Sequence, residues 1–461
     1  MKKTDLFTEF ESYSAKAFKQ QIQYDLKGAS YNDTLLWSTN EGIDIKPFYH
    51  SDEQTQVLAV PGLPQQWHIG EAIYISDPVK AASLAQKAIT GGATLLFFTA
   101  AQPFDIEMLL DDVITHNIPM YFELQFLNPE FYAALSSYAF AKAVTITITL
   151  DPIAHLIEDG NWYVSMPADL DHFTQIISSK ENRGITIDLR QYQNAGATMT
   201  QQLAYGLGQL NEYLHLIEEK GGSPSKITYT VAVGSHYFFE IAKLRALRQL
   251  TAVLLEAHKE LLPDVDVAII AHPSKRNKTL YDYNTNMLRT TTEAMSAILG
   301  GANAVVNMPY DAIYHKTNDF GQRIARNQLI ILKEESYFEA VSNPASGSYY
   351  VEAITEKLAS NALSLFKTLE ENGGLLRQLK DGVIQRKIKE SADREQQQFD
   401  QGELILLGTN KHPNPDDTMQ DTIELYPFLK IKPRKTIIVP IITKRLSESL
   451  EQQRLATENN K

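Results

Sequence analysis

ITYTVAV, at Ile227–Val233, is one of eight short runs of β-branched and aromatic residues that alternate with helix-compatible stretches. The runs are nearly continuous in such residues, which is typical of parallel strands covered on both faces. The segments between them are long enough for helical crossovers. Eight such units predict an α/β fold, a closed (β/α)8 TIM barrel. The predicted strands are Ala72–Ile75, Leu95–Thr99, Met120–Leu124, Val144–Leu150, Ile185–Leu189, Ile227–Val233, Val267–Ala271 and Ala304–Met308.

Capping residues mark the ends of the helices between these strands. An Asp-Pro or Asn-Pro pair places an N-cap side chain before proline at the first helical position, and paired glycines are typical C-caps. The predicted N-caps of this form are Asp77 and Asn128, and Pro103 and Asp105 are predicted to open the second helix. The predicted C-caps are the glycine pairs at 91–92, 221–222 and 300–301. None of these glycines belongs to a phosphate-binding motif.

Residues 1–63 are predicted to form an N-terminal arm before the barrel of residues 64–343. A helix is expected over Ser14–Leu26, ending at Gly28, and strand-like pieces over Thr34–Thr39 and Ile43–Tyr49. The arm has too few apolar residues for a core of its own. We therefore expect it to lie either on its own barrel or on a partner subunit.

Residues 344–411 are predicted to be a helical extension, and residues 412–461 a linker and C-terminal tail. Helices are expected over Tyr350–Leu369 and Leu375–Phe399, followed by a short strand at Gly402–Gly408. The tail holds an apolar run, Ile437–Ile442, and then a polar helix.

Composition excludes several classes of function. Hydrophobic residues make up 43% of the chain, enough for a large core, and a net charge of −13 argues against a nucleic-acid partner. The chain has no cysteine, which excludes disulfides, thiol nucleophiles and cysteine-ligated metals. None of the 11 histidines pairs with carboxylates at ligand spacing, so no metal site is expected. Without a signal region or a membrane-spanning run, we expect a soluble cytoplasmic protein with no membrane partner.

Polar residues follow three of the predicted strands, where a barrel places its active site. Arg190 and Gln191 could bind a carboxylate, but an arginine paired with a neighbouring strand is the interpretation we favour. The basic loop His272–Lys278 could hold phosphate, and a solvated charge run is favoured over that role. For His236 a capping or core role is favoured over that of a general base.

Specific sequence blocks resemble the barrel domain of methylmalonyl-CoA mutases, the adenosylcobalamin-dependent acyl-CoA mutases. RIARNQ (Arg323–Gln328) and NPASGSYYVE (Asn343–Glu352) carry most of the resemblance, together with the helix FFEIAKLRALRQL (Phe238–Leu250). The likeness covers roughly residues 67–411. The arm, at Trp37–Tyr49 among other residues, is more similar to small subunits of the bacterial heterodimeric enzymes.

Departures from the family pattern fall on positions that the resemblance marks as catalytic. Gly70 and Ala72 stand where the pattern has arginine and tyrosine, and Gln191 stands where it has the catalytic histidine. Glutamine does not titrate near neutral pH, so it cannot replace histidine in proton-linked chemistry. No catalytic residue is expected. The predicted substrate-pocket positions, expected to be vestigial, are Arg190, Gln191, Lys226, Thr228, His272 and Lys275.

The resemblance implies a non-catalytic small subunit that stabilises a catalytic large subunit in a heterodimer interconverting succinyl-CoA and methylmalonyl-CoA. The family's cobalamin-binding domain has no counterpart in the sequence, so no cofactor is expected on this chain, and adenosylcobalamin is expected on the partner. Two alternatives stay open. The chain could be an active mutase barrel that works with a separate cobalamin-binding subunit, or a regulatory module that binds acyl-CoA through Lys275, Arg276 and Lys278.

Overall fold

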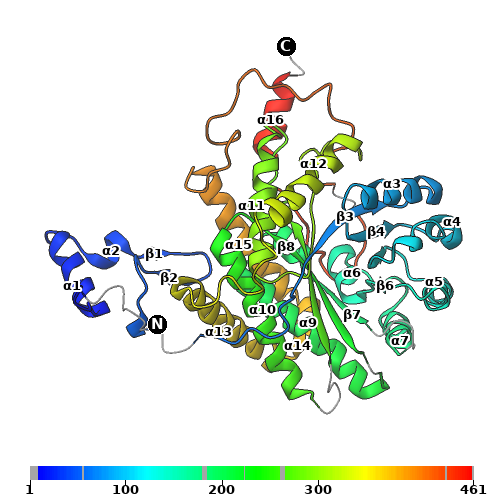
Figure 1. Cartoon of the computed structure of the whole chain (residues 1–461), viewed down its shortest axis with the longest axis horizontal. Helices are drawn as coiled ribbons and strands as arrows, with labels where there is room; N and C mark the ends of the chain where they lie inside the picture. The colour runs from blue at the N-terminus through cyan, green and yellow to red at the C-terminus, as the bar shows by residue number, and fades with distance from the viewer. Residues whose placement is uncertain are drawn as a thin grey trace, which may run out of the picture.

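Eight parallel strands form a nearly closed barrel surrounded by helices, which confirms the predicted (β/α)8 fold (Figure 1). The computed structural model describes residues 9–53, 57–178, 184–222, 224–259, 265–430 and 433–458. The strand order is β6-β5-β4-β3-β10-β9-β8-β7, so β3 pairs with β10 while β6 and β7 end the order. The strands are β3 His68–Tyr74, β4 Leu95–Ala100, β5 Met120–Leu124, β6 Ile146–Ile148, β7 Gly184–Asp188, β8 Lys226–Val233, β9 Asp266–Pro273 and β10 Ala304–Val306.

The predicted strands differ from the observed ones mainly at their ends. Met120–Leu124 matches β5 fully, whereas β3 begins four residues before the predicted Ala72. His68 and Gly70 have little intrinsic preference for strands, but register with Ala304 and Val306 of β10 draws them into the sheet. Tertiary pairing therefore sets the start of β3.

Helices alternate with the strands and cover the outside of the barrel. The predicted N-caps are confirmed, since Asp77, Asp105 and Asn128 each accept a hydrogen bond from the backbone three residues on, at 2.8–3.0 Å. Gly91, Gly221 and Gly300 occupy the predicted C-cap positions. The helices are α3 Pro78–Thr90, α4 Ile106–Leu110, α5 Pro129–Lys142, α6 Pro152–Asp159, α7 Met166–Ile177, α8 Arg190–Asn194, α9 Met199–Lys220, α10 Tyr237–Ala257, α11 Thr285–Leu299 and α12 Asp319–Ile330.

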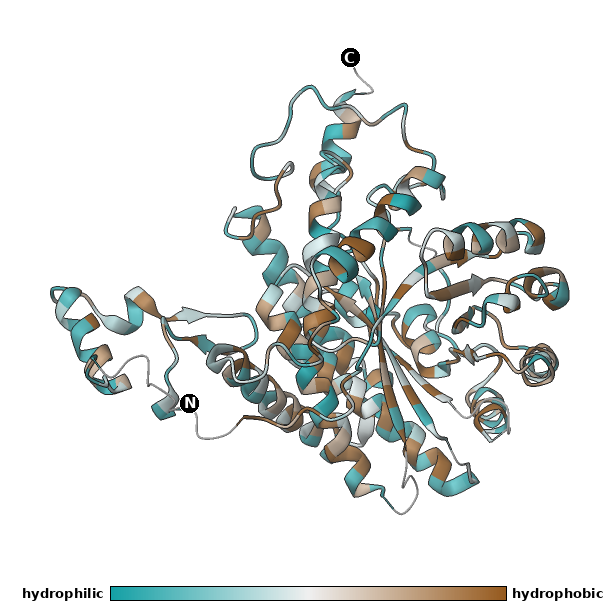
Figure 2. Cartoon of the chain, in the orientation of Figure 1, coloured by the Kyte–Doolittle hydropathy of each residue, from teal (hydrophilic) through white to brown (hydrophobic). Residues whose placement is uncertain are grey.

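The main hydrophobic core lies between the outer face of the sheet and these helices. Figure 2 shows brown apolar residues along the strands and the helices around them, and a mostly teal loop leading to the C-terminal helix. A second, small cluster fills part of the barrel interior. Its members are Leu95, Phe97, Tyr121, Ile270, Ala304 and Val306.

The arm comprises α1 (Ala15–Asp25), α2 (Tyr31–Leu35) and the antiparallel pair β1 (Trp37–Ser38) and β2 (Asp44–Ile45). The first helix was predicted correctly, and Ser14 caps it. The prediction of strand from Thr34 is wrong, because the Ser30 hydroxyl caps a helical turn there. The second predicted strand piece extends only over β2, since Pro47 cannot continue the pairing.

The arm projects from the barrel in Figure 1, but its hairpin is anchored on the barrel. The Glu41 carboxylate accepts hydrogen bonds from Met199 N at 2.7 Å and Thr200 N at 2.8 Å in the first turn of α9. The Trp37 ring stacks on His236 with centroids 5.4 Å apart. His236 is half-buried, and its side chain makes no cap hydrogen bond, so its role stays a prediction.

The extension holds three helices, α13 (Tyr349–Glu371), α14 (Gly374–Lys380) and α15 (Val383–Asp400). The single helix predicted over Leu375–Phe399 is wrong, because Gly382 adopts a left-handed conformation with φ +69° and breaks it. The strand predicted at Gly402–Gly408 is also wrong. Asn410 there satisfies three backbone groups of a turn, and a single bridge joins Leu407 to Lys411. The predicted domain limits at 63, 343 and 411 stay predictions.

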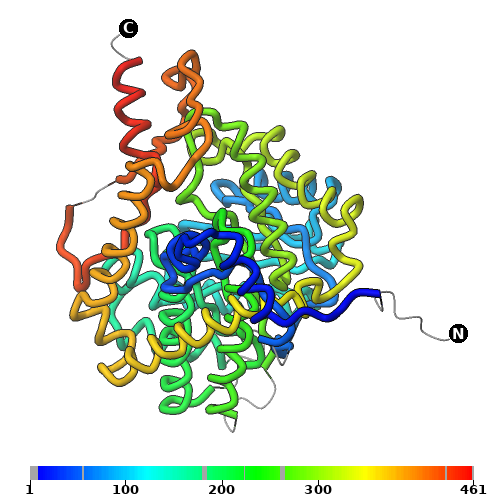
Figure 3. Tube along the Cα trace, turned by 90° about the vertical axis from the view of Figure 1, so that its left-hand side faces the viewer, coloured from blue at the N-terminus to red at the C-terminus, as the bar shows by residue number. Residues whose placement is uncertain are grey.

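The tail ends in α16 (Glu448–Glu458), and residues 433–447 before it lie on the barrel without regular secondary structure. Figure 3 shows the red C-terminal helix apart from the blue arm. No helix in the described ranges is both long and apolar enough to cross a membrane.

Candidate functional site at the mouth of the barrel

Arg190 is the centre of a charged network at the C-terminal ends of the strands. Its guanidinium pairs with Glu123 of β5 and with Asp188 of β7, where the Nε–Oδ1 distance is 2.9 Å. Burial alone would raise the pKa of Asp188, but the charge and hydrogen bonds of Arg190 outweigh it and lower that pKa. Arg190 is salt-bridged as the favoured prediction states, although β5 lies beyond β6 and is not the strand next to β7. The Nε and Nη2 groups of Arg190 are therefore already bonded to carboxylates of this chain.

Two of the three positions that the resemblance marks as catalytic, Gly70 and Ala72, carry no polar side chain. Gln191 donates from Nε2 to the carbonyl of Ile441 in the tail. Ala72 is exposed and offers only a methyl group. Gly70 lies against β10, where an added Cβ would be 2.7 Å from Cγ2 of Val306. The chain's own backbone and side chains thus occupy two of these three positions.

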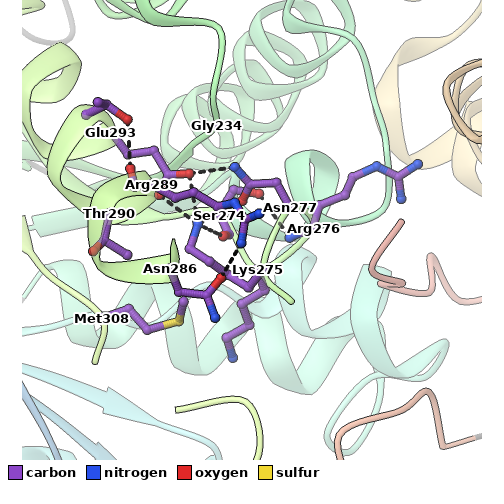
Figure 4. Close-up of polar contacts among 12 residues, drawn as sticks. Gly234, Ser274, Lys275, Arg276, Asn277, Asn286, Arg289, Thr290, Glu293 and Met308 are labelled. Atoms are coloured by element: carbon purple, nitrogen blue, oxygen red, sulfur yellow. Dashed lines mark hydrogen bonds and ion pairs between the residues drawn. The ribbon is translucent and has the colours of Figure 1, made fainter. Parts of the chain in front are cut away.

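The loop after β9 is a buried ion-pair network, so the prediction of a solvated charge run is wrong. Lys278 is 0% exposed and donates at 2.8 Å to both carboxylate oxygens of Glu293 on α11. Asn277 donates to the same carboxylate at 2.7 Å. Arg276 pairs with Glu395 on α15. Two of the three cations proposed to bind acyl-CoA therefore already have partners, and Figure 4 shows Lys275 and Arg276 pointing in different directions.

Lys275 is the exposed cation of this loop, and His272 lies beside it at the end of β9. Burial lowers the pKa of His272 well below its ordinary value, and the charge of Arg190 lowers it further. The pKa of Lys275 is lowered by desolvation and by Arg190. His272 is thus a neutral ring at neutral pH, and its buried Nε2 has no hydrogen-bond partner.

Aromatic rings fill the axis of the barrel below the mouth. Phe97 stacks on Tyr121 with centroids 6.3 Å apart and meets the His272 ring edge-on at 5.0 Å. The guanidinium carbon of Arg190 lies over the Phe97 ring, 5.8 Å from its centroid. At the other end, Lys226 Nζ donates to the Tyr121 hydroxyl at 3.2 Å. Because Phe97 is 1% exposed and Tyr121 5%, these contacts form a continuous packed column.

The interior faces of β7 and β8 carry hydroxyls that this packing leaves unpaired. The side-chain oxygens of Thr186 and Thr228 are buried without hydrogen-bond partners. A buried hydroxyl without a partner costs about 1–3 kcal/mol. The interior therefore keeps a polar lining that its packing does not satisfy.

The sequence reasoning missed Glu123, Asp151 and the column residues Phe97 and Tyr121. Asp151 follows β6 and accepts hydrogen bonds from Asp188 N at 2.8 Å and the Tyr213 hydroxyl at 2.6 Å. Burial raises its pKa to about 6. Asp151-Pro152 has the same capping form as Asp77-Pro78, and Glu123 is the lone charge of its strand, so both signals were visible in the sequence.

The family comparison agrees with the barrel fold. The model of the family described as methylmalonyl-CoA mutase matches residues 101–438. The chain belongs to the methylmalonyl-CoA mutase family. Within the described residues, no group of three or more histidines, aspartates or glutamates could hold a metal ion.

Relatives in the family include both kinds of subunit. A methylmalonyl-CoA mutase small subunit from Porphyromonas gingivalis is 29% identical over 99% of this chain and 79% of its own length. A small subunit from Streptomyces virginiae is 28% identical over 79% of this chain and 63% of its own length. The large subunit from P. gingivalis is 31% identical over 56% of this chain and 37% of its own length. The sequence-based recognition of this family is confirmed.

The residues at the mouth do not fit the cobalamin cofactor that the family implies. Arg190 is paired with two carboxylates, and the Gln191 amide nitrogen is bonded to the tail. Position 72 offers no polar atom or ring to a macrocycle. Neither a bonding partner nor a shielding ring for the macrocycle is thus present at these three positions.

Proposed function

We propose that this chain is a non-catalytic small subunit of a methylmalonyl-CoA mutase, and that it stabilises a catalytic large subunit. The observation that carries this proposal is the packed column of Phe97, Tyr121 and Lys226 below the mouth. Enzymes bind small substrates in clefts that keep a few polar groups available. Here the rings of Phe97 and Tyr121 fill the space below the mouth, and the Lys226 ammonium is bonded to the Tyr121 hydroxyl.

The chemistry of the altered positions supports the same proposal. Gln191 has no proton to exchange near neutral pH, and its amide donates to the Ile441 carbonyl. Ala72 can neither orient a substrate by hydrogen bonding nor shield one with a ring. In this proposal adenosylcobalamin and the isomerisation belong to the large subunit in a cytoplasmic complex.

The arm supplies the surface that we propose for contact with the large subunit. Phe10, Tyr13 and Tyr24 are 73%, 68% and 80% exposed on its projecting end. Aromatic residues are enriched at protein interfaces, so exposed rings on this segment favour a contact with a partner. The occurrence of small and large subunits in P. gingivalis supports a heterodimer.

The test is co-expression with the large subunit of the same organism, followed by co-purification and an assay of methylmalonyl-CoA isomerisation. We expect a complex whose activity is retained when position 72 or 191 of this chain is changed further. Tyr13→Ser with Tyr24→Ser should weaken the complex, whereas Tyr337→Ser, at a residue 73% exposed outside the arm, should not. Isomerisation by this chain with adenosylcobalamin alone, or no binding to the large subunit, would overturn the proposal.

The acyl-CoA-binding alternative has less support. Of Lys275, Arg276 and Lys278, only Lys275 is exposed. Lys275 lies near Arg190 and near three carboxylates, those of Glu123, Glu158 and Asp188, which would repel the phosphates and the free carboxylate of an acyl-CoA. Titration with coenzyme A esters should therefore produce neither heat nor thermal stabilisation.

A further inference from the structure

The barrel has one edge at which neighbouring strands do not pair. β6 and β7 stand at the two ends of the strand order, whereas β3 and β10 pair in register. Both β6 and β7 lie within the described residues. The barrel therefore consists of two half-barrels, β3–β6 and β7–β10, which backbone pairing joins on one side only.

Residues 433–447 of the tail are bonded to the β6 side of this gap. The backbone N–H groups of Ile437 and Ile438 donate to the carbonyl of Gly160 at 2.9 and 3.1 Å, just after α6. Ile441 N donates to the Ile157 carbonyl within α6 at 2.9 Å. Gly160 has φ +85° and lies so close to the tail that an added Cβ would be 2.8 Å from the Ile438 carbonyl. The segment thus follows α6 closely.

The same segment is also bonded to the other half-barrel. Gln191 donates to the carbonyl of Ile441, so Ile441 is bonded to both halves. Lys444 N donates to the Asn194 carbonyl after β7, at 3.3 Å. Arg276, after β9, donates to the Lys444 carbonyl at 2.9 Å. The segment crosses from one half-barrel to the other with backbone contacts at each end.

Apolar burial adds to these contacts on one face of the segment. Ile438 and Ile441 are 5% and 4% exposed and belong to the main core. Their neighbours Ile437, Val439 and Ile442 are 62%, 65% and 45% exposed. The side chains that face the barrel are therefore held by burial as well as by hydrogen bonds.

We propose that residues 433–447 are a strap that holds the barrel closed across its unpaired β6–β7 edge, so that releasing the strap lets the two half-barrels separate there. The strap performs the task that hydrogen bonds between strands perform around the rest of the barrel. Its release exposes the interior faces of β7 and β8 while the outer core stays folded.

The chain has no cysteine, so a single introduced thiol can report on this opening. Thr228→Cys places the thiol on the interior face of β8, where Thr228 is 0% exposed. Ala85→Cys, in a second protein, places it between α3 and the sheet, where Ala85 is 0% exposed, so that it reports global unfolding. The rate of reaction with an aromatic disulfide reagent is measured for each under native conditions.

The strap is released by Ile441→Asp, and the matched control is Val439→Asp, which adds the same charge on the exposed face of the strap. We expect Ile441→Asp to accelerate labelling at position 228 more than about tenfold, because burial of an isoleucine exceeds the free energy of one factor of ten. Labelling at position 85 should not change, and Val439→Asp should change neither rate. Amide exchange should rise at β6 and β7 but not at β3 and β10.

Two results would overturn the proposal. Unchanged labelling at position 228 in Ile441→Asp would show that the strap does not hold the edge closed. Equal acceleration at positions 228 and 85 would show that the segment only supports global stability. If Ile441→Asp does not fold, Ile441→Ala provides the same comparison with a smaller expected acceleration, and an unchanged rate there counts equally against the strap.

Discussion

Replacing Glu293 with glutamine tests whether the buried pair with Lys278 sets the stability of the loop after β9. Lys278 is 0% exposed and Glu293 1%, so no water is available to solvate the ammonium once the carboxylate loses its charge. The carbonyl of Ser274 and the side-chain oxygen of Asn277, each 2.8 Å from Nζ, are neutral and cannot replace it. Breaking a buried pair by removing one partner costs about 3–5 kcal/mol.

The measurement is urea-induced unfolding followed by tryptophan fluorescence. Glu293→Gln should lower the free energy of unfolding by about 3–5 kcal/mol, whereas removing both charges with Lys278→Met and Glu293→Leu should cost about 1 kcal/mol or less. Asp393→Asn is the exposed control, because Lys389 and Asp393 are 74% and 64% exposed. That change should cost at most about 0.5 kcal/mol. If the loss of unfolding free energy in Glu293→Gln were no larger than in Asp393→Asn, the buried pair would not set the stability of the loop after β9.

Three further predictions concern the column, the edge and the arm. Phe97→Ala removes the central ring of the column and should lower the free energy of unfolding by about 3–5 kcal/mol, measured with urea; Phe140→Ala, at a residue 73% exposed, should cost far less. Burial raises the pKa of Asp151 from 3.8 to about 6 in the folded chain, so the native state keeps this proton up to a higher pH than the unfolded chain does. The free energy of unfolding should therefore fall as pH rises from about 4 to 6. Asp151→Asn should remove that slope in unfolding measured across this range. Glu41→Ala removes the acceptor for the first turn of α9 and should cost about 1 kcal/mol, with faster proteolysis of the arm, whereas Glu11→Ala should change neither.

Local signals in the sequence predicted most of the barrel. The run Met120–Leu124 fits a strand buried on both faces, and the Asp-Pro pair at Asp77 fits a capped helix, because both depend on neighbouring residues only. The break at Gly382 was also readable, since glycine after aspartate is a stop signal within a charged helix.

The site was less predictable because its contacts join distant parts of the chain. Lys278 looks solvated in sequence, and only the packing of α11 brings Glu293 to it. Gln191 and Ile441 are 250 positions apart, and nothing near either residue indicates their hydrogen bond. Likewise, Phe97 and Tyr121 read as ordinary strand residues until the barrel closes around them.

The close contact between β3 and β10 limits what future substitutions can recover. Gly70 stands where the family pattern has arginine, and even a methyl group there would press on Val306 and on the carbonyl of Val305. An arginine at this position would therefore clash with β10 unless the two strands moved apart. Any larger side chain at position 70 therefore requires a smaller residue at position 306 first, so the two positions can change only in that order.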